Sequence, residues 1–197
     1  MNFNLKHIPS RPQKPRESGC TMMMDKGLST REAEDFVQKS GEYTDVVKFG
    51  FGTAVVSNNL KEKIKIYKDA GIRPYFGGTL FEIFFVRNQI SDFQKIVHEY
   101  GLDLLEVSDG SIVVPHDEKC EIIHKLSKDF TVLSEVGSKE EGILISPSKW
   151  VKMMTNELEA GSWKVIAEGR EGGNVGVFNQ DGVIKFNLIF DIIQEIP

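Results

Sequence analysis

The stretch Val46-Val47-Lys48-Phe49-Gly50 shows the pattern from which the fold is predicted: a short apolar run, a charged residue and then glycine. Similar apolar runs, rich in β-branched residues, alternate along the chain with longer segments of helical period. They predict strands over residues 20–24, 45–49, 73–76, 104–107, 131–135 and 165–168. The segments between them predict helices near residues 29–40, 60–70, 80–100, 117–128, 147–160 and 186–196. Such alternation is typical of a parallel sheet covered by helices.

The strand ends indicate which kind of parallel sheet this is. Nearly every predicted strand ends in a polar or charged residue followed by glycine, as in Asp25-Lys26-Gly27, Phe76-Gly77-Gly78, Glu135-Val136-Gly137 and Glu168-Gly169. In a closed barrel all such ends meet at one mouth, whereas an open sheet gathers only a few at its switch point. The glycine fingerprint of a dinucleotide-binding first turn is also absent after the first strand. We therefore predict an α/β fold of the (β/α)8 TIM-barrel type.

The number of units is lower than a complete barrel needs. The sequence accounts for about six of eight strand–helix units, and a full barrel takes roughly 250 residues. A barrel open by two strands exposes two long parallel edges, which proteins avoid. We therefore expect residues 1–197 to form a single barrel domain whose last two strands are missing from this sequence.

Composition argues against several functional classes. The net charge is -5, with acids and bases mixed along the chain, so no basic cluster indicates nucleic-acid binding. No apolar run approaches the roughly 18 residues of a membrane span, and the polar amino-terminal segment lacks the apolar stretch of a secretory signal. Two cysteines, Cys20 and Cys120, make a disulfide framework or a cysteine zinc site improbable. We expect a cytoplasmic protein with no nucleic-acid or membrane partner.

Charged residues at the strand ends are the candidate site. Lys48 stands inside an apolar strand, where a lysine is costly to bury unless it is paired or used. The barrel prediction turns it inward, and the alternative is an amine in solvent at the strand edge. Glu106 and Glu135 lie at the ends of the fourth and fifth predicted strands and Asp109 follows the fourth, and carboxylates are the hard oxygen ligands that Mg²⁺ prefers. Asp109 precedes Gly110, so it is equally suited to a turn.

Three further features are candidates for anion binding. Arg170, close to Glu168, has a planar fork suited to phosphate or carboxylate, although these residues can equally form a solvated ion-pair cluster. Gly77-Gly78 opens a predicted helix, where bare N–H groups attract anions, and is equally consistent with a tight connection. Arg16 reaches the mouth only if the amino-terminal segment folds across the barrel.

Taken together, these segments resemble the phosphosulfolactate synthase family. Seven matching stretches occur in order between about residues 14 and 197, and although each motif is weak, the ordered set is specific. They include Lys14-Pro15-Arg16, Asp25-Lys26-Gly27-Leu28, Val47-Lys48-Phe49-Gly50-Phe51-Gly52-Thr53, Gly77-Gly78-Thr79-Leu80-Phe81-Glu82, Glu106-Val107-Ser108-Asp109-Gly110, Ser134-Glu135-Val136-Gly137 and Glu168-Gly169-Arg170-Glu171. The resemblance implies a (β/α)8 barrel and Mg²⁺-dependent addition of sulfite to phosphoenolpyruvate, giving (R)-2-phospho-3-sulfolactate.

The charges in that reaction suggest roles for the candidate residues. Addition to the alkene builds an enediolate-like charge, which Mg²⁺ held by strand-end carboxylates would stabilise. A lysine, by preference Lys139, would deliver a proton to C2. The expected catalytic residues are Lys48, Lys139, Glu168 and Arg170; the expected metal ligands are Glu106, Asp109 and Glu135; and the expected contacts to small anionic substrates are Arg16, Gly77, Gly78, Ser108 and Arg170.

One departure keeps other functions open. The family commonly reads Glu-Val-Gly-Lys-Lys after the fifth strand, whereas this chain has Ser138 in place of the first lysine and retains Lys139. The alternatives are a repurposed or non-catalytic relative with a stress-related or binding role, and another phosphoenolpyruvate-type lyase on the same scaffold. A homo-oligomeric state is also left open.

Overall fold

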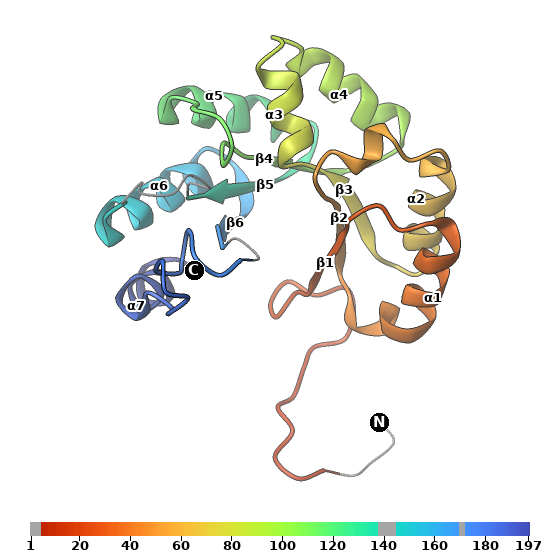
Figure 1. Ribbon diagram of the computed structural model, residues 1–197, viewed down its shortest axis with the longest axis horizontal. Helices are drawn as coiled ribbons and strands as arrows, with labels where there is room; N and C mark the ends of the chain where they lie inside the picture. Colours follow the sequence, from red (N-terminus) through yellow and green to blue (C-terminus); the bar gives the residue numbers. More distant parts are fainter. Residues whose placement is uncertain (1–4, 138–144, 170–171) are drawn as a thin grey trace.

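The strands form one curled parallel sheet. The computed structural model describes residues 5–137, 145–169 and 172–197, and six strands within them lie side by side in chain order. They are β1 (Met22–Asp25), β2 (Val46–Phe49), β3 (Arg73–Phe76), β4 (Leu104–Val107), β5 (Thr131–Val136) and β6 (Ser162–Ala167). Every neighbouring pair is parallel, so all carboxyl ends lie on one side. The sheet is a partial barrel with β1 and β6 at its edges (Figure 1), which confirms the predicted α/β barrel type.

Helices line the convex side of this sheet (Figure 1). They are α1 (Thr30–Ser40), α2 (Leu60–Asp69), α3 (Thr79–Phe85), α4 (Ile90–Glu99), α5 (His116–Leu126) and α6 (Pro147–Glu159), with short 3-10 turns η1 (Gly41–Tyr43) and η2 (Thr53–Val55). The last helix, α7 (Phe186–Glu195), packs against α6. The capping box at Ser29 and Glu32 is present and begins α1 directly after the first strand end.

Two predicted boundaries are wrong. The single helix predicted over residues 80–100 is two helices, because the chain turns at Asn88, whose φ of 56° lies in the left-handed region. Asparagine enters that region more readily than most residues. The sixth strand begins at Ser162 rather than near residue 165, and its register against β5 shifts between Val132 and Leu133.

Alternation along the strands separates two sets of side chains. Val47, Phe49 and Val107 belong to the core between the sheet and its helices. Val46, Tyr75, Leu104 and Leu133 form a second apolar cluster on the concave face, with Trp163 and Ile166 packed against it. Because successive strand residues point to opposite faces, Lys48, two residues after Val46, also lies on the concave face.

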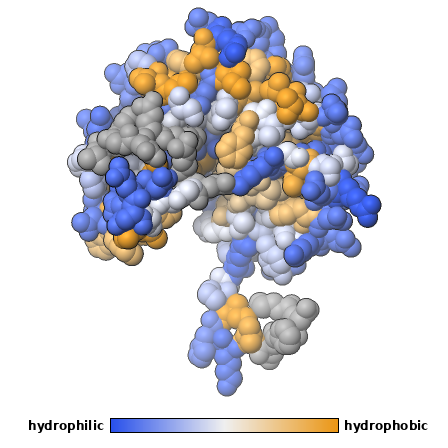
Figure 2. Space-filling model, viewed as in Figure 1, coloured by the Kyte–Doolittle hydropathy of each residue, from blue (hydrophilic) through white to orange (hydrophobic). Residues whose placement is uncertain are grey.

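Apolar surface remains exposed on α7. Its Leu188 is buried, whereas Phe186, Phe190 and Ile193 are exposed. In Figure 2 apolar side chains gather at the lower left, where α7 lies in the same view. Within residues 5–137, 145–169 and 172–197, no helix has both the length and the apolar character needed to cross a bilayer.

Candidate active site

A buried lysine connects two strands at the mouth. The Lys48 ammonium on β2 donates to Glu106 Oε1 on β4 at 2.6 Å and to Glu135 Oε2 on β5 at 3.4 Å. All three side chains are buried. Each is the last but one residue of its strand, so parallel pairing brings them together although they are separated by up to 87 residues in sequence. The prediction that strand-end charges converge is confirmed for this trio.

Tyr75 completes the environment of Glu106. Its hydroxyl donates to Glu106 Oε2 at 3.0 Å, so both oxygens of the carboxylate have a donor. Burial, together with the neighbouring Glu106 charge, raises the pKa of Tyr75 well above its ordinary value, which keeps the hydroxyl protonated. Sequence analysis did not select Tyr75, although strand alternation puts it on the concave face between Lys48 and Glu106.

One ammonium facing two carboxylates determines the protonation of the site. Burial lowers the pKa of Lys48, but attraction and hydrogen bonds to Glu106 and Glu135 outweigh it and raise the pKa to about 12. Lys48 is therefore a permanent cation at neutral pH. Burial, reinforced by the Glu135 charge, raises the pKa of Glu106 against the lowering effects of Lys48 and Tyr75. Two carboxyl groups thus face a single ammonium, and burial of Glu106 favours its neutral form.

The glycine pair after β3 allows these groups to approach closely. A Cβ atom on Gly77 would lie 2.1 Å from the Glu106 Cβ, a contact that no side chain can make. A Cβ on Gly78, whose φ is 55°, would lie 3.2 Å from both Glu106 Oε1 and the Lys48 Nζ. Space is therefore one reason for glycine at both positions.

A cavity opens above the trio. It has a volume of about 530 Å³, of a size suited to a small ligand. Its charged lining residues among the described ones are Lys48, Glu135 and Glu168, and its rim includes Phe51, Thr79, Ser111 and Asn174. Glu168 is buried, directly after β6. The mouth of the barrel is therefore a pocket with a charged floor.

Two predicted residues are engaged away from the trio. Asp109 Oδ1 accepts a 2.8 Å bond from the buried Lys119 of α5, whose ammonium also contacts Glu157 of α6 and the backbone oxygen of Glu135. The Ser108 hydroxyl donates to Glu82 Oε1 at 3.1 Å, and the same oxygen accepts from the backbone N–H of Ser111. Lys119 and Glu82 thus hold the loop after β4, although neither was selected from the sequence.

Comparison with known proteins assigns the chain to a family. The family profile described as (2R)-phospho-3-sulfolactate synthase (ComA) matches residues 9–197. The chain belongs to the phosphosulfolactate synthase family. The family identified from the sequence motifs is confirmed, and with it the prediction of an enzyme.

Relatives of the phosphosulfolactate synthase family match most of the chain. The phosphosulfolactate synthase of Bacillus subtilis (strain 168) is 36% identical over 195 residues, covering 98% of this chain and 77% of the relative. That of Methanothermobacter thermautotrophicus (strain Delta H) is also 36% identical over 195 residues, covering 96% and 76%. The Methanocaldococcus jannaschii protein is 39% identical over 178 residues, covering 87% and 70%.

Solved structures share the fold alone. A 3-hexulose-6-phosphate synthase, a TIM-barrel enzyme, superposes with a TM-score of 0.54 at 14% identity, covering 86% of this chain and 73% of its own. The carboxyl transferase domain of Rhizobium etli pyruvate carboxylase gives a TM-score of 0.54 at 11% identity, covering 88% and 33%. These likenesses agree with the barrel type and carry no information about chemistry.

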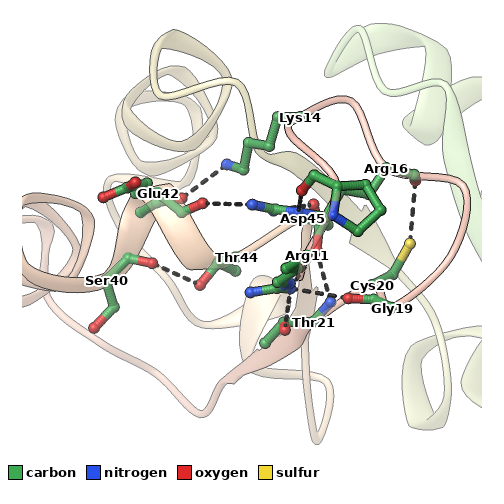
Figure 3. A network of polar contacts seen from close by, with 12 residues as sticks. Arg11, Lys14, Arg16, Gly19, Cys20, Thr21, Ser40, Glu42, Thr44 and Asp45 are labelled. Carbon is green, nitrogen blue, oxygen red and sulfur yellow. Dashed lines mark hydrogen bonds and ion pairs between the residues drawn. The ribbon is translucent and has the colours of Figure 1, made fainter. Parts of the chain in front are cut away.

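Arg16 does not join the mouth in this phosphosulfolactate synthase relative. Its guanidinium donates to Asp45 Oδ1 at 2.8 Å and to the carbonyl oxygens of Pro12 and Glu42 (Figure 3). Asp45 immediately precedes β2 and so lies at the amino end of the strands, opposite Lys48 and Glu106. Arg11 binds the same carboxylate at 3.3 Å. In the structure Arg16 therefore fastens the amino-terminal segment to the base of the barrel.

The remaining predicted positions divide as follows. Lys139 and Arg170 lie outside the described residues, as do Ser138 and Glu171. In the part of the chain that is described, no group of three or more His, Cys, Asp or Glu side chains is arranged to hold a metal ion. The three predicted metal ligands do not form one group, since Glu106 and Glu135 share Lys48 whereas Asp109 binds Lys119.

Proposed function

We propose that this protein adds sulfite to phosphoenolpyruvate and forms (R)-2-phospho-3-sulfolactate, with Mg²⁺ as cofactor. The observation that carries the proposal is the buried Lys48, which joins Glu106 and Glu135 at the floor of a 530 Å³ cavity in a member of this family. Such a convergence of buried titratable groups in a pocket is characteristic of active sites.

The proposed reaction makes one bond and moves one proton. The sulfur lone pair of sulfite forms a C–S bond to C3 of phosphoenolpyruvate, and the π electrons of the C2–C3 bond move toward the carboxylate. The resulting enediolate-like species then takes a proton at C2, and the phosphate ester stays intact. Catalysis therefore requires stabilisation of charge beside the carboxylate and a proton donor near C2.

Lys48 supplies the first of these requirements. Its pKa of about 12 makes it unsuitable as a base at neutral pH, so its role is that of a fixed positive charge. Glu106 and Tyr75 hold it in place from beneath, because Glu106 is fully buried and bound through both oxygens. Positioned in advance on rigid strands, this charge offsets the developing negative charge without reorganisation.

The donor set at the mouth is compatible with Mg²⁺. The ion is often bound through one or two carboxylates plus water and substrate oxygens. Glu135 and Glu168 are the described carboxylates that line the cavity and would hold it, whereas Glu106 and Asp109 do not line the cavity. When bound, the ion supplies Lewis-acid stabilisation of the carboxylate-side charge.

Two residues outside the described part complete the proposal. Lys139 follows β5 by three residues and would donate the proton to C2. Arg170 follows Glu168 and would bind the substrate phosphate or carboxylate through its planar fork. Gly78 lines the cavity next to Lys48, and its lack of a side chain would let the substrate approach the strand ends.

A turnover assay with product identification tests the proposal. Purified protein is incubated with phosphoenolpyruvate, sulfite and Mg²⁺, and the C–S product is identified by mass spectrometry, with and without a chelator. Glu135→Gln should lower turnover by at least roughly 10²-fold, the lower range for loss of one electrostatic catalytic group. Glu121→Gln, on an exposed position of α5, is the matched control and should leave turnover unchanged.

Lys139→Ala separates proton donation from binding. It should lower kcat with little effect on KM, because a proton donor acts mainly in the transition state. Absence of product with every combination of substrates contradicts the proposed reaction. Phosphoenolpyruvate binding without turnover would then indicate the repurposed-barrel alternative, and a product lacking sulfur would indicate another phosphoenolpyruvate lyase.

A further inference from the structure

The turn after β2 holds an aromatic side chain in an unusual conformation at the cavity. Phe51 has a φ of 54° and is followed by Gly52 with a φ of 68°. A bulky residue rarely adopts this left-handed region, which costs free energy relative to ordinary backbone. Phe51 is nevertheless 60% exposed and lines the same cavity as Lys48 and Glu135. The conformation therefore presents a phenyl ring to the pocket instead of burying it.

Contacts with β1 maintain this turn. The backbone N–H of Gly50 donates to the Asp25 carbonyl at 2.9 Å, and the Gly50 carbonyl accepts from the N–H and the hydroxyl of Thr53 at 3.0 and 2.8 Å. A Cβ atom on Gly50 would lie 2.7 Å from the Met24 Cγ, so the turn presses directly on β1. The positions before and after Phe51 are thus determined by packing and hydrogen bonds.

A buried ion pair between Asp25 and Lys63 holds the end of β1, against which this turn packs. Asp25 is fully buried; its Oδ2 lies 2.7 Å from the Lys63 ammonium and accepts a 2.8 Å bond from the Tyr67 hydroxyl. Its Oδ1 accepts from the N–H groups of Gly27 and Leu28. The Asp25 carboxylate therefore fixes the loop after β1, and the backbone carbonyl of the same residue holds the turn that bears Phe51.

Exposure alone does not distinguish Phe51, but its location does. Val55 and Val56 are more exposed, at 68% and 77%, and neither lines the cavity. Phe51 and Met24 provide the large apolar side chains in the lining of a cavity whose floor is charged. A ligand that fits this lining places a small apolar group against Phe51 and Met24 and its polar groups against the charged residues.

We propose that Phe51 is a specificity-determining residue that covers the apolar end of the bound substrate. On the proposed function, from which this inference follows, that end is the CH₂ terminus of phosphoenolpyruvate. The ring would exclude water from the carbon attacked by sulfite, and charges beside it would interact more strongly in a drier site. It would also restrict substituents on that carbon.

Paired substitutions test the covering role. Phe51→Ala should raise KM for phosphoenolpyruvate about 10-fold, because roughly half of a phenylalanine side chain would no longer be buried by the ligand. Val56→Ala removes an apolar side chain that is more exposed than Phe51 and lies outside the cavity, and it should change KM less than about 2-fold. Equal effects of the two substitutions, or none from Phe51→Ala, would overturn the proposal.

A substrate with one more carbon tests specificity. The ratio of kcat/KM for phosphoenolpyruvate to that for its 3-methyl analogue should fall about 10-fold in Phe51→Ala and stay constant in Val56→Ala, since one methylene contributes on the order of 10-fold in a pocket. A purely structural role of Phe51 would lower both values together and leave the ratio unchanged.

A binding measurement keeps the inference separate from the proposed reaction. Phe51→Trp and Val56→Trp place an indole at either position, and tryptophan emission is followed as phosphoenolpyruvate is added to the full chain. A saturable change confined to Phe51→Trp supports the covering role even if no turnover is found, in which case only the proposed reaction fails. No change, or the same change in both variants, contradicts the covering role.

Discussion

Replacing Lys48 with methionine removes the cation between Glu106 and Glu135 and keeps a side chain of similar length. The rise of the Lys48 pKa from 10.5 to about 12 corresponds to about 2 kcal/mol of stabilisation. This contribution is fully present below pH 10.5 and is lost as the pH rises through about 12. The side chain is 7% exposed, so screening by solvent reduces it little.

The variant also leaves two carboxylates buried without their ammonium. Breaking a buried pair in this way costs about 3–5 kcal/mol, and we expect a loss of that size in the free energy of unfolding near pH 8. Without Lys48 the pKa of Glu106 rises further, because Lys48 is the strongest of the influences that lower it. A carboxyl group with a raised pKa favours the fold at low pH, so the loss should be smaller near pH 5.

Urea unfolding followed by circular dichroism at both pH values measures the loss. Lys65→Met is the control, because Lys65 is 74% exposed and its ion pair with Asp69 should contribute less than about 1 kcal/mol. The double variant Lys48→Met with Glu106→Gln should recover part of the stability lost at pH 8. A loss below about 1 kcal/mol, or an equal loss at both pH values, would refute the electrostatic interpretation of the trio.

Three more predictions concern the surroundings of the trio. Tyr75→Phe should lower the free energy of unfolding by about 1–3 kcal/mol, because a Glu106 oxygen loses its donor. It should also move the acidic limb of the kcat/KM profile to higher pH, because the Tyr75 hydrogen bond lowers the Glu106 pKa. Gly77→Ala should lower the free energy of unfolding, measured by thermal unfolding, by about 3 kcal/mol or more, since its Cβ would overlap Glu106. Gly41→Ala is the control: Gly41 has a φ of -59° and a nearest contact of 3.4 Å, so this change should lower it by less than about 1 kcal/mol. Lys119→Met should destabilise the fold by about 3–5 kcal/mol in urea because Asp109 and the fully buried Glu157 lose their cation; stability within about 1 kcal/mol of the wild type would contradict this role.

The fold could be predicted because its signals are local. Each strand is a short apolar run, and parallel pairing follows from the helix between two such runs. The break at Asn88 was missed because residues 80–100 keep a helical apolar period through it, with Phe85 and Ile90 on either side. A single left-handed residue interrupts the helix there, and the apolar pattern does not record backbone conformation.

The site could be predicted only where strand geometry determines it. Lys48, Glu106 and Glu135 meet because each occupies an inward position near the same edge of the sheet. Asp109 lies beyond its strand, and its partner Lys119 comes from a helix whose lysines look alike in sequence. Which of them turns inward depends on packing between α5 and α6, which no local pattern specifies.

The charges at the mouth indicate what substrate binding still requires. Among the described residues lining the cavity, Lys48 is the cation and Glu135 and Glu168 are the acids. Lys48 is already shared with Glu106, so this lining alone repels a ligand with a phosphate and a carboxylate. The divalent ion proposed for the two carboxylates would reverse the sign of the pocket while leaving Lys48 protonated. Binding of phosphoenolpyruvate should therefore depend on Mg²⁺, and calorimetric titration with and without the ion tests this: equal affinity in its absence would show that residues beyond the described mouth supply the positive charge.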